Sequence, residues 1–373
     1  MLMKKQFIIY VSLALLSLAA CVTDFTPEVK GVSGILVVDG TITDGESVFH
    51  LSRSVGITDD IRSADTITNA EVSVERSDGV FFEGKHEGNG FYRVRNLSLD
   101  PGLEYNLKLK IGDKTYHSTA LKPLFTPEID SVSFGKASRE EPTSVYVSTH
   151  ADKGSSPYYR WSYRENWEVR SSLYANAREE NGQLIWHNLN TSENTYYCWA
   201  KDSSKTLLLG SAEKLVENRI QEHKILDIPL TDERERLSVL YHVEVSQVQL
   251  RKDAYEYFKI LWEEIERGGD IFSPILSAGN NGNVFCDSDP DELIIGFVEV
   301  ASTTRKSLFI PYDDFLYEPA SYLDCWLSNT NTLPIGMSWY RYPEVAANPR
   351  CVDCRTKPGA TKNRPAWWPN EHY

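Results

Sequence analysis

The sequence lacks most of the features that would assign it to a common functional class. Its one long apolar run covers residues 7–18 and is too short for a stable transmembrane span, and no later run approaches ~18 residues. No basic cluster stands out and the formal charge is −14, so we expect neither nucleic acid nor direct electrostatic binding to anionic lipid. Repeats and low-complexity stretches are also missing, and 41% apolar residues indicate a globular protein.

Recognisable catalytic and metal-binding motifs are missing as well. The sequence has no G-x-S-x-G elbow, no H-E-x-x-H, no Walker A motif and no Rossmann glycine pattern. Residues 287–292 alternate carboxylates as a calcium loop does, but Glu292 stands where such a loop needs Gly and Val298 where it needs Glu. We therefore favour a solvated acidic turn over a looser calcium site. The sequence predicts no enzyme activity, no cofactor and no metal.

The N-terminus carries a targeting signal. Two lysines precede the apolar run, and small residues follow it up to Cys21. The segment Leu18-Ala19-Ala20-Cys21 resembles the lipobox of bacterial lipoproteins, in which the cysteine is acylated and the chain is cut before it; the alternative is an ordinary signal peptide with a chance cysteine. We expect residues 1–20 to be a lipoprotein signal peptide, Cys21 to attach lipid, and residues 21–33 to be a tether. That lipid would hold the protein at the membrane.

Strand patterns follow the tether. Alternating apolar and polar residues, such as those of 70–75, are separated by turn dipeptides such as Asp44-Gly45 and Asp78-Gly79. Short runs at 8–12-residue spacing are typical of an all-β sandwich. We expect residues 34–123 to form an N-terminal sandwich that folds alone, with a boundary bracketed by Pro123 and Pro127.

The rest of the chain is predicted to form a larger β-rich domain over residues 128–350. Alternation continues in residues 237–245 and in the strand-like run 293–300, which we assign to this domain. Between them, apolar spacings of three and four predict a helix at about 247–267. The expected fold class is mainly β, with two immunoglobulin-like sandwiches, the second larger and carrying a packed α-helix.

The remaining cysteines suggest how the C-terminal tail, residues 351–373, is attached. Five cysteines are left after lipidation, and an oxidising compartment favours two disulfides and one free thiol. Cys351 and Cys354 form a C-x-x-C pair, but no second pair or βαβ pattern supports a redox or zinc site. We expect Cys351 or Cys354 to pin the tail to the second domain, with Cys325 as the leading partner. Closure between Cys351 and Cys354 is the alternative.

The nine tryptophans all follow the N-terminal domain. Trp161 and Trp262 are expected in the core. Trp367 and Trp368 lie in a polar tail bracketed by prolines, so they either dock onto the second domain, which we favour, or contact another protein. Tryptophans offer a large flat surface and an N–H donor, so an aromatic platform could stack sugars or anchor a partner.

Four landmarks together resemble a known family. They are the lipobox with the acidic-aromatic tether Asp24-Phe25, the strand 36–43, the Gly296-Phe297 strand, and the tail Cys351-Val352-Asp353-Cys354-Arg355 leading to Arg364-Pro365-Ala366-Trp367-Trp368-Pro369. This pattern resembles the domain-of-unknown-function 4249 family of Gram-negative cell-envelope lipoproteins. The sequence departs from the family where Gly359-Ala360-Thr361 replaces a Gly-Gly-Thr.

The resemblance implies an outer-membrane location and a partner. Members often accompany TonB-dependent receptors, which implies a non-enzymatic accessory of nutrient uptake that binds substrate or the receptor. It leaves open which side of the outer membrane the protein faces, and it carries over no site residues. A structural or adhesive surface lipoprotein is the alternative, and an enzyme with an unrecognised site is the third.

Overall fold

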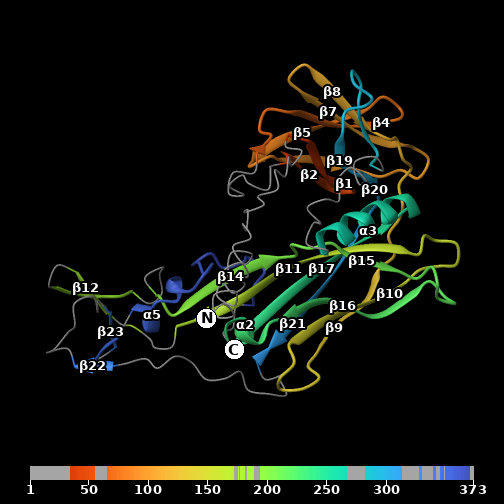
Figure 1. The fold of residues 1–373 in the computed structure, drawn as a ribbon. Coiled ribbons are helices and arrows are strands. Elements are labelled where there is room, and N and C mark those ends of the chain that lie inside the picture. Colours follow the sequence, from red (N-terminus) through yellow and green to blue (C-terminus); the bar gives the residue numbers. More distant parts are fainter. Residues whose placement is uncertain are drawn as a thin grey trace, which may run out of the picture.

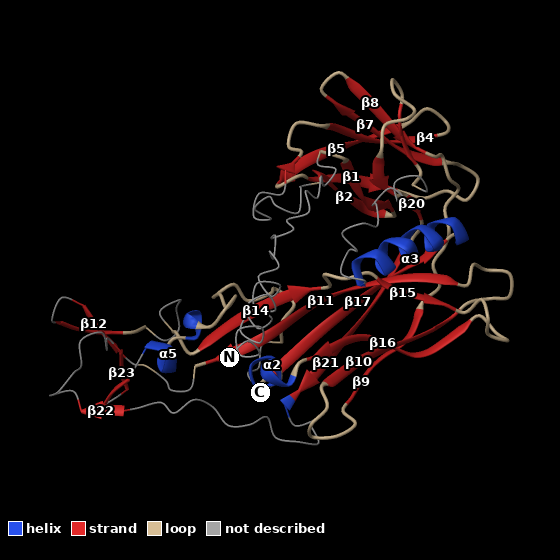
Figure 2. Cartoon of the chain, in the orientation of Figure 1, coloured by secondary structure: helices blue, strands red, loops and turns tan. Residues whose placement is uncertain are grey.

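The computed structural model shows a mainly β protein (Figures 1 and 2). It describes residues 34–54, 65–171, 175, 177–180, 183–188, 194–266, 282–312, 327–329, 339–341, 345–347 and 349–369. The expected signal peptide, Cys21, the tether and Cys325 lie outside these residues. None of the helices in the described part of the chain is long and apolar enough to cross a membrane.

The N-terminal domain is one strongly curved sheet. Its path runs β18-β8-β7-β4-β5-β6-β2-β1-β19, with β20 and β3 beside β1 and β2. Strand β5 pairs with β4 through its first half and with β6 through its second half, so the sheet turns over on itself there. The bounds are β1 (Leu36–Ile42), β2 (Gly45–Arg53), β3 (Asp65–Thr66), β4 (Glu71–Arg76), β5 (Phe81–Gly88), β6 (Phe91–Leu97), β7 (Tyr105–Ile111), β8 (Lys114–Ser118), β18 (Val284–Cys286), β19 (Ile294–Gly296) and β20 (Glu299–Val300).

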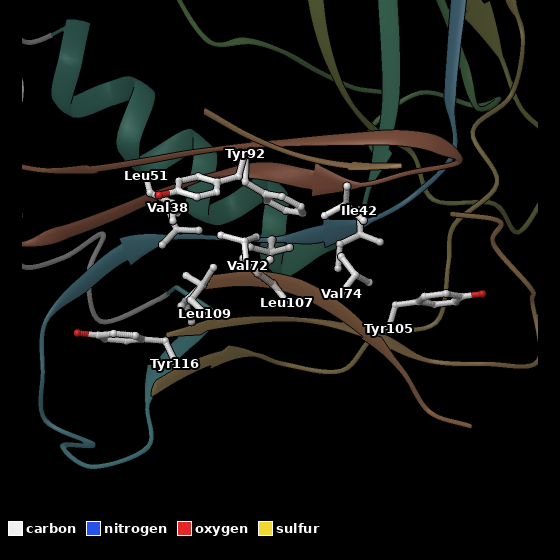
Figure 3. Packing of buried hydrophobic residues seen from close by; sticks show 14 of the residues in the cluster. Val38, Ile42, Leu51, Val72, Val74, Tyr92, Tyr105, Leu107, Leu109 and Tyr116 are labelled. Atoms are coloured by element: carbon white, nitrogen blue, oxygen red, sulfur yellow. The ribbon is translucent and has the colours of Figure 1, made fainter. Parts of the chain in front are cut away.

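The alternating residues predicted from the sequence line the inside of this curved sheet. Val72 and Val74 lie opposite Leu109 and Leu107 on the neighbouring strand, and all four are buried. Figure 3 shows them facing Val38 and the other side chains of the core. An immunoglobulin domain divides its strands between two separate sheets. Here the strands follow one continuous hydrogen-bonded path. The predicted sandwich-like packing is therefore present, but the immunoglobulin-like topology is not confirmed.

Residues 284–300, which we call the returning segment, belong to the N-terminal domain, and this corrects the sequence-based boundary. Strand β1 pairs in parallel with β19 and β20, and β8 pairs with β18. Gly296 lies opposite Val38, where a Cβ would come within 2.7 Å of the Val38 carbonyl oxygen, so the close approach requires glycine. The sequence could not reveal this pairing, because a strand has the same alternation whichever sheet it joins.

The second domain is a sandwich of two sheets. One sheet has the order β16-β10-β9, and the other has the order β14-β11-β17-β21 with β15 beside β11. Trp161 and the alternating residues of β17 lie in the core between them, as the sequence predicted. The bounds are β9 (Ile129–Gly135), β10 (Thr143–His150), β11 (Tyr158–Arg170), β14 (Tyr197–Ser203), β15 (Leu208–Ser211), β16 (Arg219–Ile228), β17 (Leu240–Leu250) and β21 (Thr303–Pro311), with a short helix α2 (Leu230–Arg236).

Helix α3 (Lys252–Glu266) lies between the two domains (Figure 1). It begins later than the predicted 247, because β17 continues to Leu250. Tyr257 and Phe258 on its buried face contact Phe297 of the segment that joins the N-terminal domain. Trp262 was expected in the core, but its side chain is 39% exposed because it lies off this face.

The tail is attached by a disulfide between Cys354 and Cys198 of β14. This rules out closure between Cys351 and Cys354, and it makes Cys198, rather than Cys325, the partner of Cys354. Cys351 is also disulfide-bonded, and Cys286 is a free, buried thiol. The tail includes α5 (Pro349–Val352) and the 3-10 turn η4 (Cys354–Thr356). Nearby is a small sheet of β12 (Ala177–Glu180), β13 (Gln183–Trp186), β22 (Leu327–Asn329), β23 (Trp339–Arg341) and β24 (Val345–Ala347).

Candidate functional site

The candidate site lies on the outward face of the sheet β14-β11-β17-β21. Successive side chains of a strand point to opposite faces, so the residues that alternate with the core positions point away from the core. Arg164 of β11 lies opposite Glu244 of β17, and their side chains form an ion pair of 2.6 Å. The next row toward the tail pairs Asn166 with His242, and His242 with Phe309 of β21.

A cleft of about 790 Å³ lies over this face, and we call it the tail cleft. One side is the sheet and the other is the C-terminal tail. Its lining combines both signs of charge with aromatic rings: Arg164, Glu165, Asn166, Lys201, Asp202, Ser203, His242, Glu244, Ser307, Phe309, Pro365 and Trp367.

The tail forms one wall of the cleft, and its backbone is hydrogen-bonded to β14 at Trp199. The Trp199 N–H donates to the Thr361 carbonyl at 2.8 Å, and the Thr361 N–H donates back to Trp199 at 2.9 Å. The Lys362 ammonium donates to the carbonyls of Asn194 and Tyr197. Together with the Cys198–Cys354 disulfide, these contacts fix the backbone just before the tryptophan pair.

The two tail tryptophans have different roles. Trp368 is 3% exposed and its indole N–H donates to Glu168 at 3.4 Å, so it docks onto the second domain. Trp367 is 51% exposed and lines the cleft. The expectation of docking therefore holds for Trp368, whereas Trp367 offers an accessible aromatic surface.

His242 connects the sheet to the tail. Its ring centroid lies 4.3 Å from that of Trp367 and 4.6 Å from that of Phe309. The side chain is only 5% exposed, and its Nδ1 has no hydrogen-bond partner among the residues that the structure describes. Burial lowers the pKa of His242 below its ordinary value of 6.5, so the ring is neutral at pH 7.

A buried polar network lies beneath the cleft. Glu165 accepts hydrogen bonds from the Tyr241 hydroxyl and from Arg236 of α2. The Arg236 guanidinium lies 4.7 Å from the centre of the Trp167 ring. Burial, followed by the adjacent Glu165 carboxylate, raises the pKa of Tyr241 well above 10. Both Glu165 oxygens are occupied, so this carboxylate fixes α2 against the sheet.

A second cleft of about 970 Å³ lies between the two domains, and we call it the interdomain cleft. Arg160 of β11 donates to the Thr41 hydroxyl of β1 at 2.7 Å, and its guanidinium lies 4.5 Å from the centre of the Phe258 ring of α3. Burial lowers the pKa of Arg160. Arg164 and Glu244 line both clefts, so the two adjoin at this ion pair on the face of the sheet.

The acidic turn at 287–292 is tied to the N-terminal domain. Asp287 accepts from Thr115 at 2.7 Å and lies 2.5 Å from His117 Nδ1. Glu292 pairs with Lys114 at 2.6 Å. These carboxylates therefore connect the returning segment to β8. No group of three or more His, Cys, Asp or Glu side chains within the described ranges is placed to hold a metal ion.

Sequence reasoning singled out the tail tryptophans but missed His242, Arg164 and Glu244. The alternation on β11 and β17 marks their polar residues as outward-facing. It does not reveal that the tail covers one end of this face and the N-terminal domain covers the other. That information lies in contacts between residues distant in the chain.

Comparison with known proteins gives one finding. A family described as "Domain of unknown function (DUF4249)" matches residues 22–307. The match includes the segment that returns to the N-terminal domain and stops before the tail. No curated protein matches the chain.

Proposed function

Since the chain belongs to the DUF4249 family, we propose that it is a lipid-anchored outer-membrane protein that serves a TonB-dependent nutrient-uptake system. In this proposal Cys21 carries the lipid, and the outward face of the second domain captures the nutrient. The protein works by binding rather than by catalysis.

The observation that carries the proposal is the polar, aromatic tail cleft. Buried polar groups in proteins normally have a hydrogen-bond partner, and a missing one calls for an explanation. His242 Nδ1 is such a group, and the His242 side chain lines the cleft beside the exposed Trp367. A concave site with a few convergent polar groups is the usual form of a ligand-binding site.

The lipid anchor is tested with Cys21→Ala. We expect the variant to leave the membrane fraction or to accumulate as an uncleaved precursor, because the acyl chains supply the membrane affinity. Metabolic labelling with a radioactive fatty acid measures lipidation directly. If the variant still partitions fully into membrane and detergent phases, the anchor assignment is wrong.

The partner is tested by isolating the lipidated protein from detergent-extracted envelopes. We expect a TonB-dependent receptor to copurify and to be identified by mass spectrometry. A second lipoprotein from the same envelope, tagged identically, is the control. Recovery of the lipidated protein without any such receptor would favour the structural or adhesive alternative.

A further inference from the structure

We propose that the tail cleft binds a neutral oligosaccharide: the Trp367 ring shifts off His242 to stack on a sugar ring, and His242 Nδ1, once uncovered, accepts a hydrogen bond from a sugar hydroxyl. This inference rests on the proposed binding function and names its ligand class.

His242 supplies the most specific part of the site. A neutral imidazole has one N–H donor and one acceptor nitrogen. Nδ1 has no partner in the described part of the chain, and the atom is fully buried, so a ligand reaches it only when a covering side chain moves. Leaving such a group unsatisfied costs free energy that a ligand hydroxyl would recover. Trp367, half exposed and 4.3 Å from the imidazole, is the side chain that can move, while the Phe309 ring stays against His242.

Trp367 supplies the apolar contact. A sugar ring has a face of C–H groups edged by hydroxyls, and a tryptophan offers a large flat surface with a polar N–H. The Trp367 side chain is half exposed, yet the backbone beside it is fixed by the docking of Trp368. Because its backbone is already fixed, only the two side-chain torsions of Trp367 lose conformational entropy when a ligand binds.

The balance of charge favours a neutral ligand. Arg164 pairs with Glu244 on the sheet, and Lys201 and Asp202 line the cleft beside them. A hydroxyl can both donate to a carboxylate and accept from a guanidinium. A fully apolar ligand would instead remove these charged groups from water without replacing their hydrogen bonds. A peptide that added a strand would pair with the backbone of the edge strand β14, whereas the ligand contacts assigned here, His242 and Trp367, lie on the face of the sheet and on the tail.

The length of the face favours several sugar units. The tail cleft adjoins the interdomain cleft at Arg164 and Glu244. From His242 to Val248 on β17, the outward face extends six residues, or about 20 Å. A single monosaccharide would occupy only part of this distance.

The test uses the purified full-length lipidated protein in detergent. Binding is measured on an array of neutral oligosaccharides of two to six units, built from common hexoses, pentoses and N-acetylhexosamines. Oligosaccharides that contain uronic or sialic acids, and a library of short peptides, are further probes. We expect one neutral series to bind and the longer members to bind more tightly. The affinity for the best of them is then measured by calorimetry.

Two variants test the assigned contacts. Trp367→Ala should weaken binding about tenfold, because it removes one aromatic contact. His242→Phe keeps a ring in place but removes the acceptor, and should weaken binding by a similar factor. Trp262→Ala is the matched control, because Trp262 is also partly exposed but lines neither cleft. The affinity of the Trp262→Ala variant for the oligosaccharide should equal that of the unmodified protein.

Several results would overturn the inference. They are no binding to any neutral series, binding confined to the anionic sugars or the peptides, or sugar affinity that is the same in Trp367→Ala and in the unmodified protein. Receptor copurification separates this outcome from a failure of the proposed function. A protein that recovers its receptor but binds no sugar would refute the ligand class alone.

Discussion

Two segments distant in the sequence complete the two domains, and they are attached in different ways. Residues 284–300 enter the N-terminal domain as three strands, and their apolar side chains join its core. The tail, described over residues 351–369, lies against the second domain, where two disulfide-bonded cysteines, a few hydrogen bonds and a few buried side chains such as Trp368 hold it. A segment buried in a core has its side chains committed to packing. A segment fastened at a few points can leave a residue such as Trp367 available for a ligand.

The largest effect should come from removing the returning segment. A fragment of residues 34–123 lacks the core side chains of Val284, Cys286, Ile294, Val298 and Val300. At ~1.5–3 kcal/mol for each buried side chain, the loss is on the order of 10 kcal/mol, comparable to the stability of a whole domain. We therefore expect no cooperative thermal transition by circular dichroism, in contrast to the expectation from sequence alone.

The matched control is the same fragment with residues 282–302 joined to it by a flexible linker. This version should regain a cooperative transition, because it restores β18, β19 and β20. If the short fragment alone melts cooperatively, the returning strands are not needed for folding, and the contrast between the two segments is lost.

A smaller loss is expected where the returning segment meets α3. Glu299 is fully buried and is paired with Arg251, whose backbone N–H also donates to it at 3.0 Å. Removing one partner of a buried ion pair costs about 3–5 kcal/mol, because the other charge stays buried without compensation. Arg251→Met should lower the free energy of unfolding by about this amount in denaturant titrations. Adding Glu299→Leu should restore much of it; a double variant as unstable as Arg251→Met would show that the charge is not the cause.

Breaking the disulfide should affect the tail more than the cores. The bond joins residues separated by 156 positions, and typical disulfides contribute about 2–4 kcal/mol. The variant with Cys198→Ser and Cys354→Ser should show faster amide hydrogen exchange in residues 354–369 and weaker ligand binding. Cys286→Ala changes a free cysteine of the N-terminal core and should leave exchange in the tail unchanged. Equal protection of the tail in both variants would contradict its attachment by the disulfide.

The smallest effect is a dependence on pH with opposite signs at Glu299 of the returning segment and at His242, which lies beneath the tail. Burial lowers the pKa of His242 below 6.5, so its unfolded form gains a proton first as the pH falls. Its contribution to the free energy of unfolding is complete above pH 6.5 and is lost as the pH falls toward the folded pKa, at up to about 1.4 kcal/mol per pH unit.

Glu299 has the opposite sign. Burial raises the pKa of Glu299 above 4.5, so its contribution to the free energy of unfolding is complete below pH 4.5 and is lost as the pH rises through the folded pKa. His242→Phe should flatten the loss of stability that begins as the pH falls below 6.5; an unchanged slope would contradict it. Burial also lowers the pKa of His223, so the part of the pH dependence of stability that comes from His223 should remain in the His242→Phe variant.

The local features of the fold could be predicted from the sequence. Alternation predicted the strands of both domains, and three-and-four spacing predicted α3, because both periods depend on which residues face a core. The seven-residue helix α2 was missed, since so short a helix shows too little of its period. The pairing of β1 with β19 could not be predicted, although the Gly296-Phe297 strand and strand 36–43 were two of the four family landmarks. These two landmarks pair with each other in the sheet, and a single sequence does not show which distant strands pair.

The candidate site was predictable only in part. The tail cysteines and tryptophans are conspicuous because they stand in a polar, proline-rich segment. Cys198, however, was not chosen as a disulfide partner, because the sequence gives no sign that β14 lies under the tail. His242 carried no motif, and its importance comes from the rings around it and from its unpartnered nitrogen in the described structure.

The parallel pairing of β1 with β19 and β20 also sets the order of assembly. The chain is made from its N-terminus, so β1 emerges early, whereas its partners emerge only after most of the second domain. Until then one side of β1 is an open strand edge, which is a template for pairing with other chains. Contacts between such distant residues also slow folding. The nascent protein therefore passes through a stage in which its first domain is incomplete, and a chaperone that covers strand edges would act at that stage.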